Sequence, residues 1–189
     1  KSRYIATLNM DFLANCFTLP SLTLKNPLLY KVLREADMVT ADGMPLVWLS
    51  KLKKTPIKER ISGADMVLDV ARLAAEKNYS IFILGGNEQL CRKASKKLVD
   101  MNPGLNIAGY DTPTVKHTGP GIPESILDDQ LIINKINHSK ADILYIGLGN
   151  PKQELWYDRN KDKLNVAVSI GMGGSLAFIT KEIRRAPKL

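Results

Sequence analysis

Short apolar segments that end in glycine-rich or acidic turns recur along this chain of 189 residues. The expected strands cover residues 4–8, 37–41, 81–84, 106–110, 143–146 and 166–170. Helical patterning lies between them, in residues 66–77, 88–100 and 124–138 and in segments that begin at Pro27, after Pro151 and near Ser175. Apolar strands that alternate with helices indicate a parallel sheet covered on both faces. We therefore expect an α/β, Rossmann-like fold, with a mostly parallel sheet and a single domain over residues 1–189.

Four turns follow expected strands and hold most of the polar or glycine residues that a site would need. They comprise Asp42 with Gly43, residues 85–87, residues 147–154 and residues 171–174. The carboxyl ends of parallel strands share one edge of the sheet, and ligands of such sheets bind outside that edge. We expect the four turns to converge there. Any Rossmann-like protein would allow the same step, so the convergence alone names no function.

The turn after residues 143–146 is the most informative of the four. Gly147 and Gly149 form a Gly-x-Gly turn, and Pro151 stands where a helix would begin. Free backbone N–H groups at a helix start, together with Lys152, suit an anionic group such as a diphosphate. An ordinary strand-to-helix loop would show the same pattern, so both interpretations stay open.

Two charged residues are candidates for chemistry. Asp42 follows its strand directly, so it should project from the carboxyl edge, where a carboxylate could act as a general base. A simple Asp-Gly turn is the alternative. Arg60 precedes Ser62, which with Asp65 predicts a capping box, and a guanidinium near a helix start suits a phosphate. A salt bridge from Arg60 to Glu59 or Asp65 is the alternative.

Composition narrows the class of partner. The formal net charge of +8 implies an acidic partner or simply a soluble surface, and the basic residues concentrate in residues 51–60 and 181–188. Aromatic residues do not interleave with these clusters, which argues against a platform for single-stranded nucleic acid. The two cysteines, Cys16 and Cys91, fit no metal motif and should be buried free thiols.

Several known signatures are missing from the sequence. There is no GxxxxGK[ST] loop, no GxGxxG fingerprint, no Asp-x-Asp pair and no His/Cys cluster. These absences weigh against a P-loop NTPase and a dinucleotide enzyme, and they leave a catalytic metal without an obvious site. No apolar run approaches the ~20 residues that a membrane span needs.

A set of short motifs carries a resemblance to a known family over essentially the whole chain. In chain order they are Thr7 and Asn9, Ala41 to Gly43, Glu59 to Asp65, Leu84 to Gly86, Gly149 to Glu154, the glycines of residues 171–174 followed by Ser175, and Arg185 to Pro187. With these motifs in this order, the chain resembles the WecG/TagA/CpsF glycosyltransferases. The order and spacing are specific, although each motif is short.

The resemblance implies transfer of N-acetylmannosamine or a related sugar from a UDP-sugar to a polyprenyl-diphosphate-linked GlcNAc, with inversion and without a metal or other cofactor. It makes Asp42 the catalytic base and places Thr7, Asn9, Arg60 and Gln153 in the pocket. The expected catalytic residues are Asp42, Arg60 and Thr7. The expected substrate-binding residues are Asn9, Gly43, Gly85, Gly86, Gly147, Gly149, Pro151, Lys152, Gln153, Glu154 and Gly173.

The chain departs from the family pattern at three positions: Leu8 replaces a proline, Ala177 an aspartate and Lys181 a glycine. The donor sugar therefore stays open. Resemblance also implies an N-terminal segment and a basic C-terminal appendage outside residues 1–189. By this interpretation the enzyme works in the bacterial cytoplasm, peripheral to the inner face of the membrane and in contact with its anionic surface. A homo-oligomer stays open, and no nucleic acid is expected. The alternatives are a nucleotide-binding module without turnover and a basic nucleic-acid-binding domain.

Overall fold

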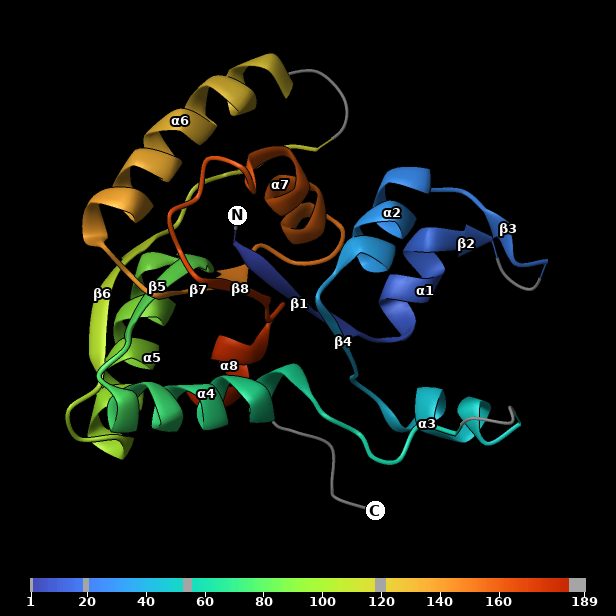
Figure 1. Ribbon diagram of the computed structural model, residues 1–189, viewed down its shortest axis with the longest axis horizontal. Helices are drawn as coiled ribbons and strands as arrows, with labels where there is room; N and C mark the ends of the chain where they lie inside the picture. Colours follow the sequence, from blue (N-terminus) through green and yellow to red (C-terminus); the bar gives the residue numbers. More distant parts are fainter. Residues whose placement is uncertain (1, 19–20, 53–55, 118–121, 184–189) are drawn as a thin grey trace.

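The fold is built on one parallel sheet. The computed structural model describes residues 2–18, 21–52, 56–117 and 122–183, the last range without the side chains of residues 122–127. Within these ranges six strands pair in the order β4-β1-β8-β7-β5-β6, all in parallel (Figure 1). The strands are β1 (Arg3–Leu8), β4 (Met38–Ala41), β5 (Ser80–Gly85), β6 (Asn106–Asp111), β7 (Ile143–Gly147) and β8 (Val168–Gly171). A small antiparallel hairpin, β2 (Phe17–Thr18) and β3 (Thr23–Leu24), stands apart from the sheet.

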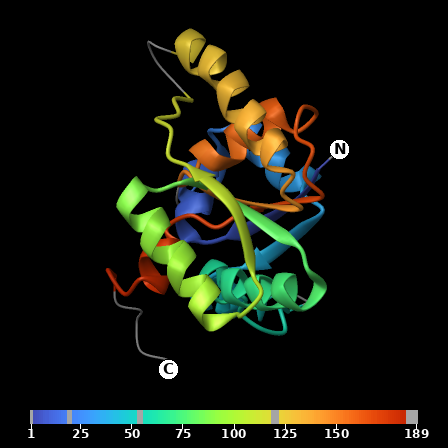
Figure 2. The same ribbon diagram turned by 90° about the vertical axis from the view of Figure 1, so that its left-hand side faces the viewer.

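Helices cover both faces of the sheet, as predicted. The helices are α1 (Met10–Cys16), α2 (Pro27–Glu35), α3 (Met44–Ser50), α4 (Gly63–Lys77), α5 (Glu88–Met101), α6 (Ile122–Ser139), α7 (Lys152–Asn160) and α8 (Ser175–Ile179). One face carries α2, α6 and α7, and the other carries α4, α5 and α8. Figure 2 shows α6 and α7 above the sheet and α4 and α5 below it.

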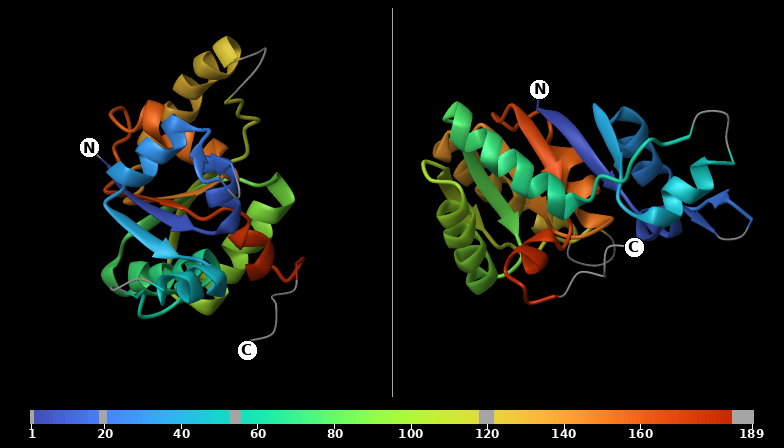
Figure 3. Two further views of the ribbon diagram at one scale, coloured as in Figure 1. Left: turned by 90° about the vertical axis from the view of Figure 1, so that its right-hand side faces the viewer. Right: turned by 90° about the horizontal axis from the view of Figure 1, so that it is seen from below.

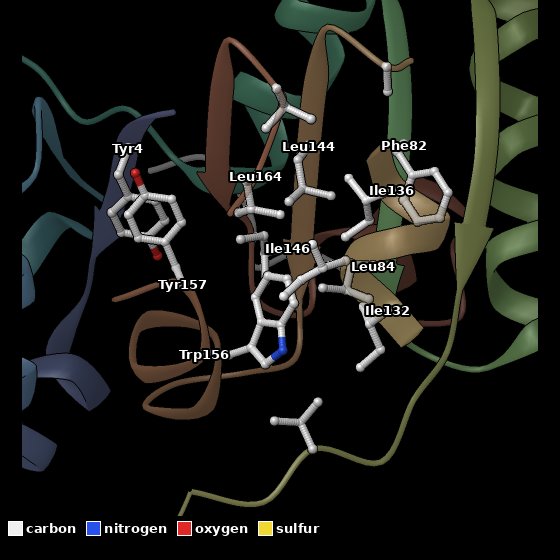
Figure 4. Close-up of a cluster of buried hydrophobic side chains, with 14 of the residues drawn as sticks. Tyr4, Phe82, Leu84, Ile132, Ile136, Leu144, Ile146, Trp156, Tyr157 and Leu164 are labelled. Carbon is white, nitrogen blue, oxygen red and sulfur yellow. The ribbon is translucent and has the colours of Figure 1, made fainter. Parts of the chain in front are cut away.

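Side chains of the central strands alternate between two cores. Leu144 and Ile146 of β7 pack under Trp156 of α7 and the α6 residues Ile132 and Ile136, as Figure 4 shows. The intervening residues Ile143 and Tyr145 pack on the opposite face with α4, α5 and α8. Both faces of β7 are therefore buried at the centre of the sheet, which explains why its sequence is a continuous apolar run.

Helix starts follow the predicted caps. Asn26 accepts a hydrogen bond from Leu29 N, with Pro27 as the first residue of α2. Ser62 Oγ accepts from Asp65 N at 3.2 Å and donates to Asp65 Oδ2 at 2.6 Å, so the predicted pair caps α4. The two thiols are buried as expected, and burial raises the pKa of Cys16 and Cys91 to about 11.

Some elements differ from the sequence prediction. Helices α1 and α3 and the β2–β3 hairpin were not predicted, because each is too short to show a clear period. The cover is incomplete at the edge strand β4, where Met38 and Val39 are exposed. The helix predicted over residues 124–138 begins slightly earlier, at Ile122, and residues 118–121 before it lie outside the described part.

The chain order places a topological switch point between β5 and β7. After β5 the chain runs through α5 outward to β6, whereas after β7 it runs through α7 in the other direction to β8. Neighbouring strands whose connections diverge in this way leave a crevice at their carboxyl ends, and ligands of open α/β sheets bind at such a point.

Candidate functional site

The predicted turns lie at the same edge of the sheet. Residues at or next to the ends of adjacent strands are register partners: Leu8 with Ala41, Ile146 with Gly171 and Gly85 with Gly147. Since all pairs are parallel, the turns that follow these strands leave from a common edge. The predicted convergence is confirmed.

Two glycines pack the turns against each other at the crevice. A Cβ on Gly85 would lie 2.5 Å from the carbonyl carbon of Gly147, and a Cβ on Gly147 would lie 3.1 Å from Gly173 O. Gly85 also adopts a φ of +111°, which disfavours other residues. Their close approach explains why glycine stands at both positions, and a direct contact with substrate stays a prediction for them, as it does for Gly86.

Other glycines border open space. Neither Gly149 nor Gly173 would bring a Cβ within 4 Å of another atom, and both have positive φ values, of 78° and 52°. Gly174 is equally open. The backbone of these turns can therefore be approached closely by a ligand, which fits the predicted role of Gly149 and Gly173.

Asp42 directly follows β4 in the chain, and in space its side chain lies against the start of α4. Its backbone N donates to Leu8 O at 2.7 Å, and its Oδ2 accepts from Gly63 N, at the first residue of α4, at 3.0 Å. The carboxylate is half-buried. It is thus held at the start of α4 and at the carboxyl edge of the sheet, as the strand-end argument predicts, and Gly43 beside it has a φ of +141°.

The start of α4 also meets the turn after β8. A Cβ on Gly63 would lie 3.0 Å from Ser175 Oγ and 3.5 Å from both Asp42 Oδ2 and Met172 O. A side chain at Gly63 would press on Ser175 Oγ, and the Asp42 carboxylate also lies next to Gly63. The sequence argument did not single out Gly63 or Ser175 separately; the glycine after the helix cap was the available signal.

Thr7 and Asn9 lie at the end of β1, and their side chains form hydrogen bonds within the protein. Thr7 is buried, and its Oγ1 donates to Gly171 O at 2.7 Å. Asn9 Oδ1 accepts from Phe12 N at 2.9 Å and caps α1. Both residues border the predicted site, and their proposed contacts with substrate stay predictions.

Gln153 joins the turns after β7 and β8. Its Oε1 accepts from Gly173 N at 3.0 Å, and its Nε2 donates to Glu154 Oε1 at 2.6 Å. A polar side chain in the first turn of a helix is expected to be exposed, and for Gln153 this expectation was wrong: the side chain is buried, because the β8 turn folds over it. Its backbone N is not free for an anion either, since it donates to Gly149 O at 3.0 Å.

Glu154 is fully buried at the centre of a polar chain. Asn150 Nδ2 donates to its Oε2 at 2.9 Å, and Asn15 Nδ2 of α1 donates to Asn150 Oδ1 at 2.7 Å. Burial raises the pKa of Glu154 to about 7, although the hydrogen bonds from Gln153 and Asn150 act in the opposite direction. With no exposed surface, Glu154 supports the loops of the site and does not line it. The first-turn position of the residue had suggested a direct contact.

The buried side chain of Tyr4 in β1 packs against Gly171. Its ring stacks on Tyr157 with centroids 4.2 Å apart, and its buried hydroxyl has no hydrogen-bond partner among the described atoms. A Cβ on Gly171 would lie 2.5 Å from that hydroxyl and 2.9 Å from Gln153 Nε2. Glycine at position 171 is therefore a packing requirement beneath the site.

Arg60 lies at the rim. Ile61 N donates to Ala41 O at 3.0 Å, which fastens the segment beside the end of β4. The Arg60 guanidinium is partly exposed and forms a salt bridge to Asp65 Oδ2 at 3.5 Å, the second of its two predicted alternatives. Such a surface pair is weak and can yield to a ligand phosphate. Lys152 is exposed, and Pro151 precedes α7 as predicted.

The described residues contain no group of three or more His, Cys, Asp or Glu side chains placed to hold a metal ion. Nor does that part of the chain include a helix long and apolar enough to cross a membrane. A cavity of about 330 Å³ lies at the opposite edge of the sheet, beside Tyr4, Asp37 and Lys161, and so away from the four turns.

Comparison with known proteins assigns the family. The family model described as "Glycosyl transferase WecG/TagA/CpsF family" matches residues 1–189. This chain belongs to that family. It is 29% identical over 164 residues to the N-acetylglucosaminyldiphosphoundecaprenol N-acetyl-beta-D-mannosaminyltransferase of Bacillus spizizenii, which covers 87% of this chain and 60% of that protein.

Two further relatives in the WecG/TagA/CpsF family have the same name as the Bacillus spizizenii protein. The Bacillus subtilis protein is 27% identical over 158 residues, which cover 84% of this chain and 57% of the relative. The Staphylococcus aureus protein (strain NCTC 8325) is 27% identical over 157 residues, or 83% of this chain and 58% of the relative. The chain thus spans a little under two thirds of the length of the curated relatives that it matches.

Proposed function

We propose that this chain carries the catalytic core of an inverting glycosyltransferase that moves N-acetylmannosamine, or a related sugar, from a UDP-sugar to a polyprenyl-diphosphate-linked GlcNAc. Membership of the family and the names of the relatives support the reaction class and the acceptor. One observation carries the assignment to residues: Thr7 and Gln153 form hydrogen bonds with the turn of residues 171–175, and Asp42 and Ser175 of that turn both lie next to Gly63.

In this mechanism Asp42 removes the proton from the acceptor hydroxyl. The hydroxyl oxygen then attacks the anomeric carbon of the donor from the face opposite the diphosphate. The bond between that carbon and the diphosphate oxygen breaks, and UDP leaves with the electron pair, so the configuration inverts. The hydrogen bond from Gly63 N fixes one carboxylate oxygen and so orients the base.

The diphosphate takes its place over the open turns. Gly149 and Gly173 allow close approach of the ligand to the backbone, and Arg60 and Lys152 provide positive charge at the rim. Placed donors and charges of this kind stabilise the negative charge that develops on a leaving group. The mechanism assigns no step to a metal ion or another cofactor.

The partners and the cellular place follow from this reaction. A polyprenyl acceptor is embedded in a bilayer, so the enzyme would act at the inner face of the bacterial membrane. The proposal involves no nucleic acid, and self-association is not required by it.

A transfer assay tests the proposal. The protein is incubated with UDP-N-acetylmannosamine and a short-chain lipid-diphosphate-GlcNAc, and the product is analysed by mass and by the anomeric coupling constant. We expect a disaccharide whose new linkage is inverted relative to the donor. UDP binding without any product would instead favour a nucleotide-binding module, and retention of configuration would contradict the role of Asp42.

A further inference from the structure

Helix α3 lies at the surface, and several of its exposed side chains are apolar. Leu46 and Val47 face inward and are buried, yet Trp48 and Leu49 are each 52% exposed. Leu52, just after the helix, is 84% exposed. A helix that is apolar on both faces is normally buried or in contact with lipid. Within the described residues, nothing covers the outer face of α3.

The same segment is strongly basic. Between Met44 and Ile61 the sequence has five lysine or arginine residues and one acidic residue, Glu59. Lys51, Lys58 and Arg60 are at the surface beside the apolar side chains, while residues 53–55 lie outside the described part. Exposed Trp and Leu bordered by Lys and Arg is the composition of segments that lie in the interface of an anionic bilayer.

The position of α3 joins this surface to the candidate site. The helix begins directly after Asp42 and Gly43. Figure 1 and the right panel of Figure 3 agree that α3 lies at the end of the molecule opposite β6, beyond the edge strand β4. The exposed side chains therefore belong to the β4 end of the sheet, in the helix that directly follows Asp42 and Gly43.

We propose that α3, with Lys51, Leu52 and residues 56–61, forms a membrane-docking surface for an anionic lipid bilayer. Trp48, Leu49 and Leu52 enter the headgroup region, and Lys51 and Lys58 bind lipid phosphates. The inference rests on the proposed function in one respect, that a lipid-linked acceptor must reach Asp42 from a bilayer.

A second copy of the chain is the competing occupant, and charge argues against it. A two-fold contact would place the same segment of each copy against the other. The basic residues would then face one another with a single acidic residue on each side. Anionic lipid satisfies the apolar and the basic side chains together.

Tryptophan fluorescence tests the docking directly. The chain has two tryptophans, and Trp156 is fully buried, so a quencher in the bilayer can reach Trp48 alone. We expect vesicles of phosphatidylcholine and brominated phosphatidylglycerol to quench and blue-shift the emission, and vesicles of phosphatidylcholine alone to leave it unchanged. Unchanged emission with both vesicles would overturn the proposal.

Matched variants test the residues by vesicle sedimentation. Trp48→Ser with Leu52→Ser, and separately Lys51→Glu, should lower the partition coefficient on anionic vesicles by about tenfold or more. Controls remove the same chemistry elsewhere: Leu131→Ser with Val99→Ser, and Lys96→Glu, all at exposed positions of α5 and α6. Controls that lose as much binding as the α3 variants would contradict the assignment.

Two further readouts separate the alternatives. If light scattering shows a dimer that Trp48→Ser dissociates, the surface is a contact between copies and the proposal is wrong. Vesicle binding that depends on Trp48 without any sugar transfer would support the docking surface and reject the proposed function. Sugar transfer to a water-soluble acceptor without any vesicle binding would support the proposed function and reject the docking surface.

Discussion

Gln153 and Glu154 are neighbours in the chain, and their buried side chains are joined by a hydrogen bond of 2.6 Å from Gln153 Nε2 to Glu154 Oε1. The side-chain oxygen of Gln153, Oε1, accepts from Gly173 N in the β8 turn. Through this pair, the turn after β7 holds the turn after β8. Gln153 therefore links the two turns that form the site, and it is also a candidate contact with the donor.

Gln153→Ala should destabilise the fold, because it removes both hydrogen bonds and leaves Gly173 N and Glu154 short of a partner. Loss of a buried partner costs about 1–3 kcal/mol in the free energy of unfolding. This replaces the expectation of a small effect that an exposed Gln153 implied. Urea denaturation measures the loss, and Gln130→Ala on the exposed face of α6 is the control. Equal stability of both variants would show that the pair does not hold the turns.

Asp42→Asn should keep the hydrogen bond from Gly63 N but lose the base. We expect UDP binding by calorimetry to stay close to that of the unmodified protein and transfer to fall by about 10²–10⁴-fold. Asp100→Asn, at an exposed position on α5, controls for loss of a carboxylate. Full transfer activity in Asp42→Asn would reject Asp42 as the base.

Arg60→Ala should slow transfer or weaken donor binding without lowering the melting temperature much. Its salt bridge to Asp65 is partly exposed, and such pairs contribute less than about 1 kcal/mol. Removing a charge that stabilises a leaving group costs on the order of 10²–10³-fold in rate. Arg72→Ala removes a similar exposed pair, with Glu76, in the C-terminal half of α4. If Arg60→Ala melts much lower while its kinetics are unchanged, Arg60 is a structural residue.

The pH dependence of stability should report on Glu154. Its pKa is about 7 in the folded chain and 4.5 as the ordinary value, so the folded state binds the proton more tightly. The free energy of unfolding should therefore fall as the pH rises from about 4.5 to 7, by up to about 3 kcal/mol from this group, and level off above.

Glu154→Gln cannot ionise, so its unfolding free energy should vary less over that window. The variant also turns an NH₂ group toward Asn150 or Gln153, both of which donate to the carboxylate, so its absolute stability at low pH should be lower. The slope with pH is therefore the measurement that decides. An identical slope in the variant and the unmodified chain would mean that Glu154 does not titrate in this range.

The sequence predicted the parts of the site that follow from strand ends and caps. Asp42 at the end of β4, the Ser62–Asp65 cap and the glycine turns at one sheet edge all depend on local pattern and parallel pairing. The burial of Gln153 could not be predicted, because it depends on Gly173 folding over it from a turn that is 20 residues away. Likewise, α3 has no periodic polar face from which a helix could be inferred.

Gly171→Ala should separate packing beneath the site from contact with substrate. The added Cβ would lie 2.5 Å from the Tyr4 hydroxyl and 2.9 Å from Gln153 Nε2. Tyr4 cannot retreat, because it is fully buried and stacked on Tyr157. Overpacking of this kind costs about 1–3 kcal/mol, and here it should also displace Gln153 and weaken UDP binding.

Gly174→Ala is the matched control in the same turn. Its Cβ would meet no atom within 4 Å, and its φ of −82° is accessible to alanine. We expect its unfolding free energy to stay within about 0.5 kcal/mol of that of the unmodified chain. Weaker UDP binding at unchanged stability in Gly174→Ala would indicate that the open space over this turn is occupied by the nucleotide. Equal destabilisation by both alanines would instead refute the claim that Tyr4 and Gln153 require glycine at position 171.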